Sequence, residues 1–475
     1  MPHLPRQIRD RQRLKYLIAD IASAEVVWLM FLIFRWMVYD GRMFGYTEIL
    51  VPAFNFYTPL LLYPIGCVVV HYLSGYYMRP LQRSLPNEFL TTAIASAIIA
   101  LTAFFAVILD DVVTDYRHYY YSLFVLFGLQ LVISYPLRLA ITLHMRQRIH
   151  NGDFLYNTAI IGLGATAQHI AQELKKNIYD SKIVGFVGIG KSELPRLKAH
   201  KIGDLAQFGD LKKKYGITNV VIALESDATE AELYSTINQL YGYNVEIQCV
   251  PRTYDLVTGL AKIQHLNTIP LVNLTTLPMA DWQISIKRAF DIVAALVAML
   301  LSAPIVLVCA ICIKCTSKGS IFYRQERIGM YRKPFKIIKL RTMYTNSEDD
   351  GQPHLSAKDD KRITSVGHVL RKYRIDELPQ FWNIFVGDMS WVGPRPERQF
   401  FIDKITEKAP YYCLIYKIRP GLTSWGPIKV GYTDTLDKMV ERLNYDIVYL
   451  ENMSLLMDLK ILLYTVGVIA HGKGQ

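Results

Sequence analysis

The stretch LRKYRIDELPQFWNIFVGDMSWVGPRPER, residues 370–398, contains an adjacent acidic pair, Asp376 and Glu377. Four arginines flank the pair: Arg371, Arg374, Arg395 and Arg398. Pro379 follows closely, and proline is tolerated in the first turn of a helix, where its missing N–H is not needed. We therefore predict that the pair lies at a helix start, where the helix dipole favours phosphate groups. Such a pair could hold a metal, attack phosphorus or form solvated salt bridges, and the stretch alone leaves these alternatives open.

Composition places this stretch in a membrane-associated chain of two or three domains. The chain has 475 residues, 51% of them hydrophobic, and the apolar runs concentrate in residues 1–150. A formal net charge of +12 beside such runs favours anionic lipid at a cytoplasmic membrane face, and we expect no nucleic acid partner. Cys309, Cys312 and Cys315 lie at helical spacing in an apolar run, which favours buried, reduced thiols over a metal cluster.

Residues 1–150 predict a four-span transmembrane domain. The candidate spans are residues 16–38, 56–78, 89–109 and 119–143. Each approaches the roughly 20 residues that a membrane-spanning helix needs. Basic residues precede the first span and follow the second and fourth, whereas the loop after the third contains Asp110, Asp111 and Asp115. This asymmetry predicts that both ends of the domain are cytoplasmic. For Asp20, near the cytoplasmic end of the first span, we expect interfacial placement or pairing with another helix.

Residues 151–255 predict a small, doubly wound, Rossmann-like α/β domain. Gly162, Gly164 and Ala167 have the spacing of a dinucleotide-binding turn between a strand and a helix. Further strands are expected at 182–188, 219–224 and 244–250, with helices between them. However, the acid that binds the ribose should end the second strand, and Gly188 and its neighbours provide no carboxylate there. The pattern leaves open whether the domain binds NAD or is a structural or regulatory module.

A linker at 256–280 is expected to precede a catalytic domain at 281–475. The apolar run from Ala289 to Ile313 is long enough to span a bilayer, but basic residues flank it on both sides. The positive-inside rule therefore favours a re-entrant helix at about 286–313 over a fifth transmembrane span. Ser302 and Pro304 mark the expected break, because an internal proline removes a backbone hydrogen bond and kinks a helix.

The motifs FYRQERIG, KLRTM, RIDELPQFWNIFVGDMSWVGPRPE and IRPGLTSWG, in this order, resemble the monotopic polyprenyl-phosphate phosphoglycosyl transferases, or bacterial sugar transferases. The catalytic resemblance covers about residues 284–475. The longer layout, with four spans, a Rossmann-like domain and a catalytic domain, is similar to the undecaprenyl-phosphate galactose and glucose phosphotransferases. These initiate the synthesis of bacterial capsule and O-antigen. The resemblance implies a multi-pass protein of the bacterial inner membrane with its catalytic domain on the cytoplasmic face.

The resemblance also implies a two-step reaction. A UDP-sugar binds with Mg²⁺, and Asp376 attacks the sugar-bearing phosphorus, releasing UMP and forming a phosphosugar-enzyme. Undecaprenyl phosphate then displaces the aspartate and carries away the sugar-1-phosphate, expected to be a hexose-1-phosphate. Asp376 is the implied nucleophile, and Glu377 helps to hold the metal or manage protons. An aspartate with an ordinary pKa of about 3.9 is already ionised at neutral pH and needs no general base.

Arginines are expected to bind the phosphate groups of the two substrates. Arg371, five residues before the nucleophile, matches the family's phosphate-binding arginine, and Arg395 lies in a motif associated with nucleotide binding. Arg324 and Arg341, in the basic segment after the apolar helix, are further candidates for holding phosphate or nucleotide. Arginine forks and Mg²⁺ together would neutralise the repulsion between an aspartate anion and a diphosphate.

Several positions depart from the family pattern. The helix break reads Ser302-Ala303-Pro304 rather than Ser-Pro, and Arg332 stands where glycine is common. Ser424 to Tyr432 replaces the usual tail, so the segment could recognise a different group.

Two other classes of function are possible. One is a membrane-anchored, NAD-dependent sugar-nucleotide oxidoreductase using Gly162 and Gly164. The other is a non-catalytic scaffold for capsule assembly. A homodimer is the expected assembly.

Overall fold

The computed structural model describes residues 6–40, 54–78, 80, 84–108, 116–151, 156–177, 181–189, 200–225, 227–243, 245–251, 271–344, 360, 362–431 and 435–470. The chain forms two compact units. One joins Leu4–Leu155 to Ala280–Ile286, and the other contains Tyr156–Met279 and Lys287–Gln475. Most of the predicted linker at 256–280, and the acidic loop after the third predicted span, lie outside the described residues.

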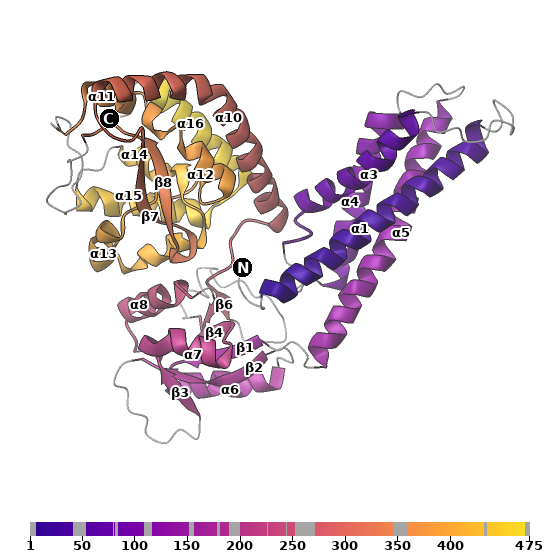
Figure 1. The fold of residues 1–475 in the computed structure, drawn as a ribbon. Helices are drawn as coiled ribbons and strands as arrows, with labels where there is room; N and C mark the ends of the chain where they lie inside the picture. The colour runs from indigo at the N-terminus through magenta and orange to yellow at the C-terminus, as the bar shows by residue number, and fades with distance from the viewer. Residues whose placement is uncertain are drawn as a thin grey trace. The chain divides into compact units, whose positions relative to one another are not determined.

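Long apolar helices build the first unit (Figure 1). They are α1 (Arg6–Arg35), α3 (Phe54–Leu73), α4 (Leu85–Ala103) and α5 (Arg117–His150), with π-helical extensions of α1 at Trp36–Asp40 and of α4 at Phe104–Ile108. Three of these, α1, α4 and α5, are long and apolar enough to cross a membrane, and α3 contains a shorter apolar helix at 60–73. Trp28, Phe31 and Leu126 pack in the core of this unit, whereas Leu61, Phe105 and Val132 are exposed. This outward apolar surface is what a lipid environment requires.

A buried ion pair joins two of these helices. Arg138 on α5 donates from Nε to Oδ1 of Asp20 on α1 at 2.7 Å, and its Nη2 lies 2.7 Å from the same oxygen as an ion-pair contact. Tyr77 donates its hydroxyl to the other oxygen at 2.5 Å. The Arg138 guanidinium also lies 4.0 Å from the centre of the Tyr76 ring. The expected pairing of Asp20 with another helix is confirmed, and both charges are almost completely buried.

The turn that contains Tyr76 and Tyr77 also contacts the start of another helix, α10 (Asp281–Thr316). Gly75 has a φ of 75°, and a Cβ added there would lie 2.6 Å from the backbone of both Asp281 and Trp282. Glycine is therefore required at this position for two reasons, its left-handed backbone and the close approach of α10. This contact groups the first residues of α10 with the four-helix unit.

We expect Arg138→Met to destabilise the four-helix unit by about 3–5 kcal/mol, because it leaves Asp20 buried without its cation. The double variant Asp20→Leu/Arg138→Met removes both charges and should recover much of the loss. Thermal unfolding of the detergent-purified protein measures both effects. Arg11→Met, which removes an exposed charge from α1, is the matched control. A double variant as unstable as Arg138→Met would contradict the pairing argument.

The second unit begins with a six-stranded sheet ordered β3-β2-β1-β4-β5-β6, in which β1 to β5 run parallel and β6 is antiparallel. The strands are β1 (Tyr156–Ile161), β2 (Ser181–Gly188), β3 (Lys201–Asp204), β4 (Asn219–Ile222), β5 (Glu246–Cys249) and β6 (Val272–Asn273). The helices are α6 (Ala165–Asn177), α7 (Phe208–Tyr215) and α8 (Glu230–Tyr241), and a 3-10 turn occupies Leu205–Gln207. The predicted strands at 182–188, 219–224 and 244–250 are confirmed within a few residues at their ends. The order is that of doubly wound dinucleotide-binding sheets.

Most of the C-terminal part is helical, with two small sheets. Antiparallel β7 (Phe322–Ile328) and β8 (Pro334–Leu340) form one sheet, and parallel β9 (Ser390–Val392) and β10 (Gly421–Thr423) form the other. The helices after α10 are α11 (Ser365–Lys372), α12 (Gln380–Val386), α13 (Gln399–Lys408), α14 (Trp425–Val430), α15 (Leu436–Glu451) and α16 (Leu455–Ala470). The 3-10 turns are η4 (Met330–Arg332), η5 (Ile375–Glu377) and η6 (Pro410–Lys417).

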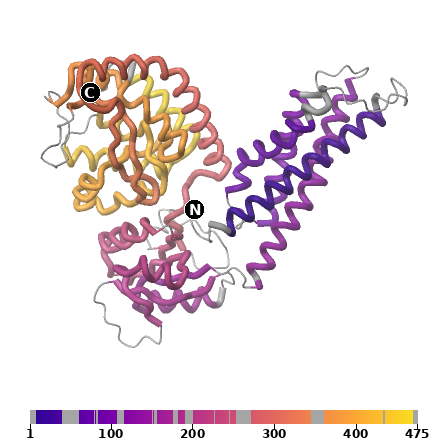
Figure 2. The backbone as a smooth tube through the Cα atoms, viewed as in Figure 1, coloured from indigo at the N-terminus to yellow at the C-terminus, as the bar shows by residue number. Residues whose placement is uncertain are grey.

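Helix α10 contains 36 residues with Pro304 inside, and the helix is continuous through the predicted break. A straight helix of that length would measure about 54 Å. Figures 1 and 2 show that α10 instead changes direction part-way along. Its first half packs through Ala295 against Ile337 of β8, and its second half packs through Ile313 against Leu340 of the same strand. Both halves therefore lie on one compact body, and an internal proline accounts for a bend.

Candidate active site

The acidic pair lies in a single 3-10 turn between two short helices. Helix α11 ends at Lys372, and Arg374 then adopts a left-handed conformation with a φ of 54°. The turn η5 holds Asp376 and Glu377, and α12 starts directly after Pro379. The pair thus precedes the helix rather than lying in its first turn. The reversal at Arg374 turns the chain so that the pair faces β8, which contacts η5.

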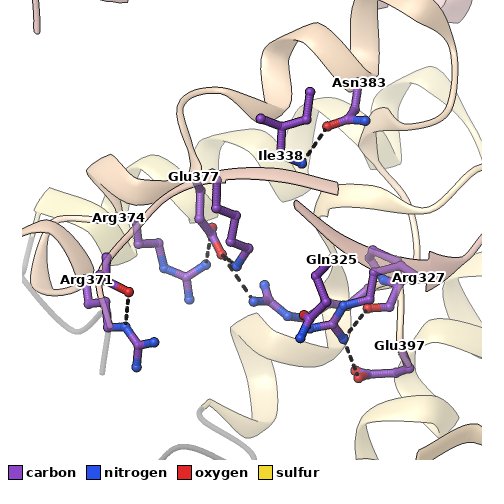
Figure 3. A network of polar contacts seen from close by, with 12 residues as sticks. Gln325, Arg327, Ile338, Arg371, Arg374, Glu377, Asn383 and Glu397 are labelled. Carbon is purple, nitrogen blue, oxygen red and sulfur yellow. Dashed lines mark hydrogen bonds and ion pairs between the residues drawn. The ribbon is translucent and has the colours of Figure 1, made fainter. Parts of the chain in front are cut away.

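Three cations surround Glu377 (Figure 3). Its Oε1 accepts from Lys339 Nζ at 3.1 Å and from Arg395 Nη2 at 3.2 Å, and its Oε2 accepts from Arg374 Nη1 at 3.5 Å. Burial alone would raise the pKa of Glu377, but the attraction of Lys339, Arg395 and Arg374 outweighs burial and holds that pKa well below its usual range. Glu377 is therefore an ionised, fully engaged carboxylate.

Asp376 has the opposite environment. The residue is 8% exposed, and its carboxylate forms no hydrogen bond or ion pair with any residue in the described part of the chain. Burial raises the pKa of Asp376 to about 6, Lys339 opposes the rise, and the charge of Glu377 adds to it. At neutral pH Asp376 is mostly ionised, and no described residue bonds to its oxygens. Two adjacent carboxylates therefore have different chemistry, one held by cations and one available.

Two of the predicted arginines lie at this pair. Arg395 contacts Glu377 directly, and the nearby charge of Arg371 lowers the pKa of Asp376. Arg371 also donates from Nε to the Thr342 hydroxyl at 2.9 Å, which fixes its side chain beside the site (Figure 3). The structure thus brings together four of the six predicted polar groups: Asp376, Glu377, Arg371 and Arg395.

The other two predicted arginines lie elsewhere. Arg341 donates to the backbone carbonyls of Lys318 at 2.7 Å and Ser317 at 2.8 Å, directly after α10. It therefore fixes the chain directly after that helix. Arg324 is exposed on β7 and pairs with Ile338, whereas Lys339, the residue that reaches Glu377, pairs with Tyr323. Because side chains alternate along a strand, Arg324 lies on the face opposite Lys339.

Sequence reasoning missed Lys339 and the support behind the site. Lys339 belongs to KLRTM. Side chains alternate between the two faces of a strand, but the motif does not show which face meets the acidic pair until the pairing of β7 with β8 is known. Glu397 accepts from Arg327 at 3.3 Å and also bonds Arg442 on α15. Asp446, one turn further along α15, accepts from the Gly426 backbone at 3.2 Å and from the Arg395 backbone. These contacts fix two segments relative to α15: the turn that contains Arg395, and the start of the divergent segment at 424–432.

The carboxylates of this site fit a magnesium ion only in part. Among the described residues, no group of three or more His, Cys, Asp or Glu side chains could hold a metal. Mg²⁺ at phosphate-transfer sites is often bound by one or two carboxylates together with substrate phosphates. The oxygens of Asp376, to which no described residue bonds, fit that role. Glu377 fits it less well, because both of its oxygens already accept from cations.

The fold and the site define a membrane-associated protein with an acidic pair ringed by cations. A family profile described as "Bacterial sugar transferase" matches residues 282–472. An exopolysaccharide production protein, PSS, of Rhizobium leguminosarum bv. phaseoli is 37% identical over 195 residues, which cover 40% of this chain and 98% of that protein. The chain therefore belongs to the bacterial sugar transferase family.

Two longer relatives are similar over a larger part of this chain. A UDP-N-acetylgalactosamine-undecaprenyl-phosphate N-acetylgalactosaminephosphotransferase of Aeromonas hydrophila is 35% identical, over 54% of this chain and 59% of that protein. A UDP-glucose:undecaprenyl-phosphate glucose-1-phosphate transferase of Klebsiella pneumoniae is 34% identical, over 61% of each chain. The matched part of this chain thus spans about three-fifths of the length of these two relatives.

We expect Asp376→Asn to stabilise the protein at pH 7.5 by about 1–3 kcal/mol, because it removes the cost of burying an ionised carboxylate. A raised pKa in the folded state means that the wild type loses stability as pH rises from about 4 through about 6. The advantage of the variant should therefore shrink between pH 7.5 and pH 5. Thermal unfolding at both pH values measures it, with the exposed Asp388→Asn as control. A destabilised variant at pH 7.5 would show that the neighbouring cations outweigh burial.

Proposed function

We propose that the protein transfers a sugar-1-phosphate from a UDP-sugar to undecaprenyl phosphate, and so initiates the synthesis of a surface polysaccharide. Family membership and the activities for which the two longer relatives are named support the reaction class. The observation that carries the mechanism is the contrast within the pair: Asp376 is buried, mostly ionised and not bonded to any described residue, beside Glu377, which organises three cations. That arrangement suits an attacking carboxylate and a polyanionic substrate.

In the first step, a carboxylate oxygen of Asp376 attacks the phosphorus that bears the sugar. The bond from this phosphorus to the bridging oxygen of the diphosphate breaks, and UMP leaves with the electron pair. The product is an acyl phosphate that links Asp376 to the sugar-1-phosphate. In the second step, a phosphate oxygen of undecaprenyl phosphate attacks the same phosphorus, and the Asp376 carboxylate leaves. Neither step requires a general base, because both attacking oxygens are anionic.

Lys339, Arg395 and Arg374 supply the positive charge that such a substrate needs. Glu377 holds these three side chains in one place, and Arg371 adds a fourth charge near Asp376. Their fixed positions offset the repulsion between the aspartate and the diphosphate. Mg²⁺, when bound through Asp376, would neutralise further phosphate charge. Glu377 would contribute indirectly, because it holds the three basic side chains that face the substrate.

Helix α10 is proposed to be re-entrant, so that the catalytic domain stays on the cytoplasmic face of the bacterial inner membrane. Three observations support this: the bend, the packing of both halves on one body, and basic residues at both ends of the apolar run. Exposed leucines on α10 and α16, among them Leu300, Leu301 and Leu463, offer an apolar surface to the inner leaflet. The lipid phosphate would then reach the depth of the acidic pair.

Several finer features also remain proposals. The transferred group is proposed to be a hexose-1-phosphate, although the names of the relatives include both glucose and N-acetylgalactosamine. The product would be a capsule, an exopolysaccharide or an O-antigen, and the protein is expected to form a homodimer. The α/β domain is taken as Rossmann-like from its strand order. A silent scaffold is disfavoured because it would need neither an acidic pair nor the cations that surround it.

Asp376→Asn is expected to lower UMP release from UDP-sugars by at least about a thousandfold, because an amide is a poor nucleophile. A panel of UDP-sugars with detergent-solubilised enzyme and Mg²⁺ measures the release, and EDTA should suppress it. Intact mass after incubation without undecaprenyl phosphate should show a sugar-phosphate adduct on the wild type and none on the variant. Asp388→Asn, an exposed change in the same motif, should retain activity. Full turnover by Asp376→Asn would refute the assigned nucleophile.

Cysteine accessibility tests the topology. Single cysteines at Ala280 and Lys318, exposed positions on the two sides of the apolar run, are introduced into a cysteine-free background. Both should react with a membrane-impermeant maleimide only after spheroplasts are opened. A cysteine at Tyr116, before the fourth span, is the control that should react from outside. Labelling of Lys318→Cys in intact spheroplasts would establish α10 as a fifth span instead.

A further inference from the structure

The glycine turn of the α/β domain is built as in dinucleotide-binding proteins, but it is already filled. Gly162 directly follows β1 and has a φ of 124°, and a Cβ there would lie 2.2 Å from the carbonyl oxygen of Ala223. This first glycine is thus required by a close approach of the chain after β4. The chain then enters α6 at Ala165, so the N-terminus of a 13-residue helix points out of the turn.

The carboxylate of Glu225, just beyond β4, occupies that helix N-terminus. Its Oε1 accepts from the Thr166 backbone N–H at 3.0 Å, and its Oε2 accepts from the Thr166 hydroxyl at 3.0 Å. The first N–H groups of a helix have no partner within the helix, and the pyrophosphate of a bound dinucleotide uses them. A carboxylate has the charge and the acceptor geometry of one phosphate group, so Glu225 takes the place of the ligand.

Gly164 leaves the space that this carboxylate fills. A Cβ added at Gly164 would lie 1.9 Å from Glu225 Oε1. In dinucleotide-binding turns the second glycine allows the backbone to approach the pyrophosphate. Here the missing side chain at Gly164 leaves room for the carboxylate of Glu225. No positive φ requires glycine at 164, so its clash with Glu225 is the main constraint there.

The ribose end of the expected site has a carboxylate, but it comes from a neighbouring strand. The carboxylate of Asp204, at the end of β3, lies 2.6 Å from where a Cβ of Gly188 would be. Asp204 is paired with Lys201 at 2.8 Å. The space beside the end of β2 therefore holds a carboxylate from the neighbouring strand that already has its own cation. A carboxylate at this edge is the group that binds a ribose hydroxyl in dinucleotide-binding folds, so the obstacle to a dinucleotide in this domain lies at the glycine turn.

We propose that Glu225 is an autoinhibitory occupant of the glycine turn, which closes the α/β domain to dinucleotides and to other phosphate-bearing ligands. Such a ligand binds only when the Glu225 side chain leaves Thr166. A carboxylate attached to the same chain competes at a high effective concentration, so the affinity of the closed turn for phosphate is low. This contact lies apart from the acidic pair and does not depend on the proposed transferase reaction.

NADH fluorescence titration of the full-length protein in detergent tests the contact. The wild type should show no saturable binding below millimolar NADH, whereas Glu225→Ala should bind at least about tenfold more tightly. Glu225→Gln, which keeps one acceptor oxygen but loses the charge, should fall between them. Glu230→Ala removes an exposed carboxylate of the same domain and should behave as the wild type.

A second substitution checks where the new binding occurs. Adding Gly164→Val to Glu225→Ala places a side chain in the vacated space and should abolish the gain. Saturable micromolar binding by the wild type would overturn the proposal. So would folded Glu225→Ala and Glu225→Gln variants that bind NADH no better than the wild type, with thermal unfolding reporting the fold. UMP release is assayed separately, and its absence would bear on the transferase proposal alone.

Discussion

The carboxylate of Glu377 is the interaction on which the candidate site depends. It joins Lys339 of β8, Arg374 of the turn after α11, and Arg395 of the turn after β9. A partly buried anion with several cations is well compensated, whereas those cations without it would repel one another. Both oxygens of Glu377 accept from cations, whereas the adjacent Asp376 lies among the same charges without a direct bond to any described residue. The structural carboxylate thereby leaves its neighbour available for chemistry.

Charged side chains also attach the apolar helix α10 to the rest of its unit. Arg288 donates to the carbonyls of Ile384 and Phe385 at the end of α12, at 2.8 and 2.9 Å. Arg341 donates to the carbonyls that follow α10 itself. Helix ends expose carbonyl groups that need donors, so Arg288 satisfies the end of α12 from the first turns of α10. Arg341 fixes the chain that follows α10. A long apolar helix bound in this way can bend at its proline and remain part of one folded body.

In the α/β domain, a carboxylate is also bound by groups of the same chain, but there it fills a possible ligand position. An unpaired helix N-terminus attracts an anion, and at α6 that anion belongs to the chain itself. The same fold that carries ligands in other proteins can thus be retained with its phosphate position filled. In both the catalytic domain and the α/β domain, a carboxylate and its partners, rather than apolar packing alone, decide which ligands the fold can bind.

The sequence alone determined the local features whose physical causes are short-range. Apolar length predicted the membrane helices, glycine and strand periodicity predicted the α/β elements, and the acidic pair with its ordered motifs indicated the family. Tertiary structure alone decided which cations reach that pair. Lys339 and Arg341 both belong to KLRTM, yet only Lys339 contacts Glu377, while Arg341 bonds the chain directly after α10. Likewise, Glu225 meets Thr166 because β1 and β4 are neighbours in the sheet. Pairings between residues distant in sequence depend on register and chain reversal, which no local pattern specifies.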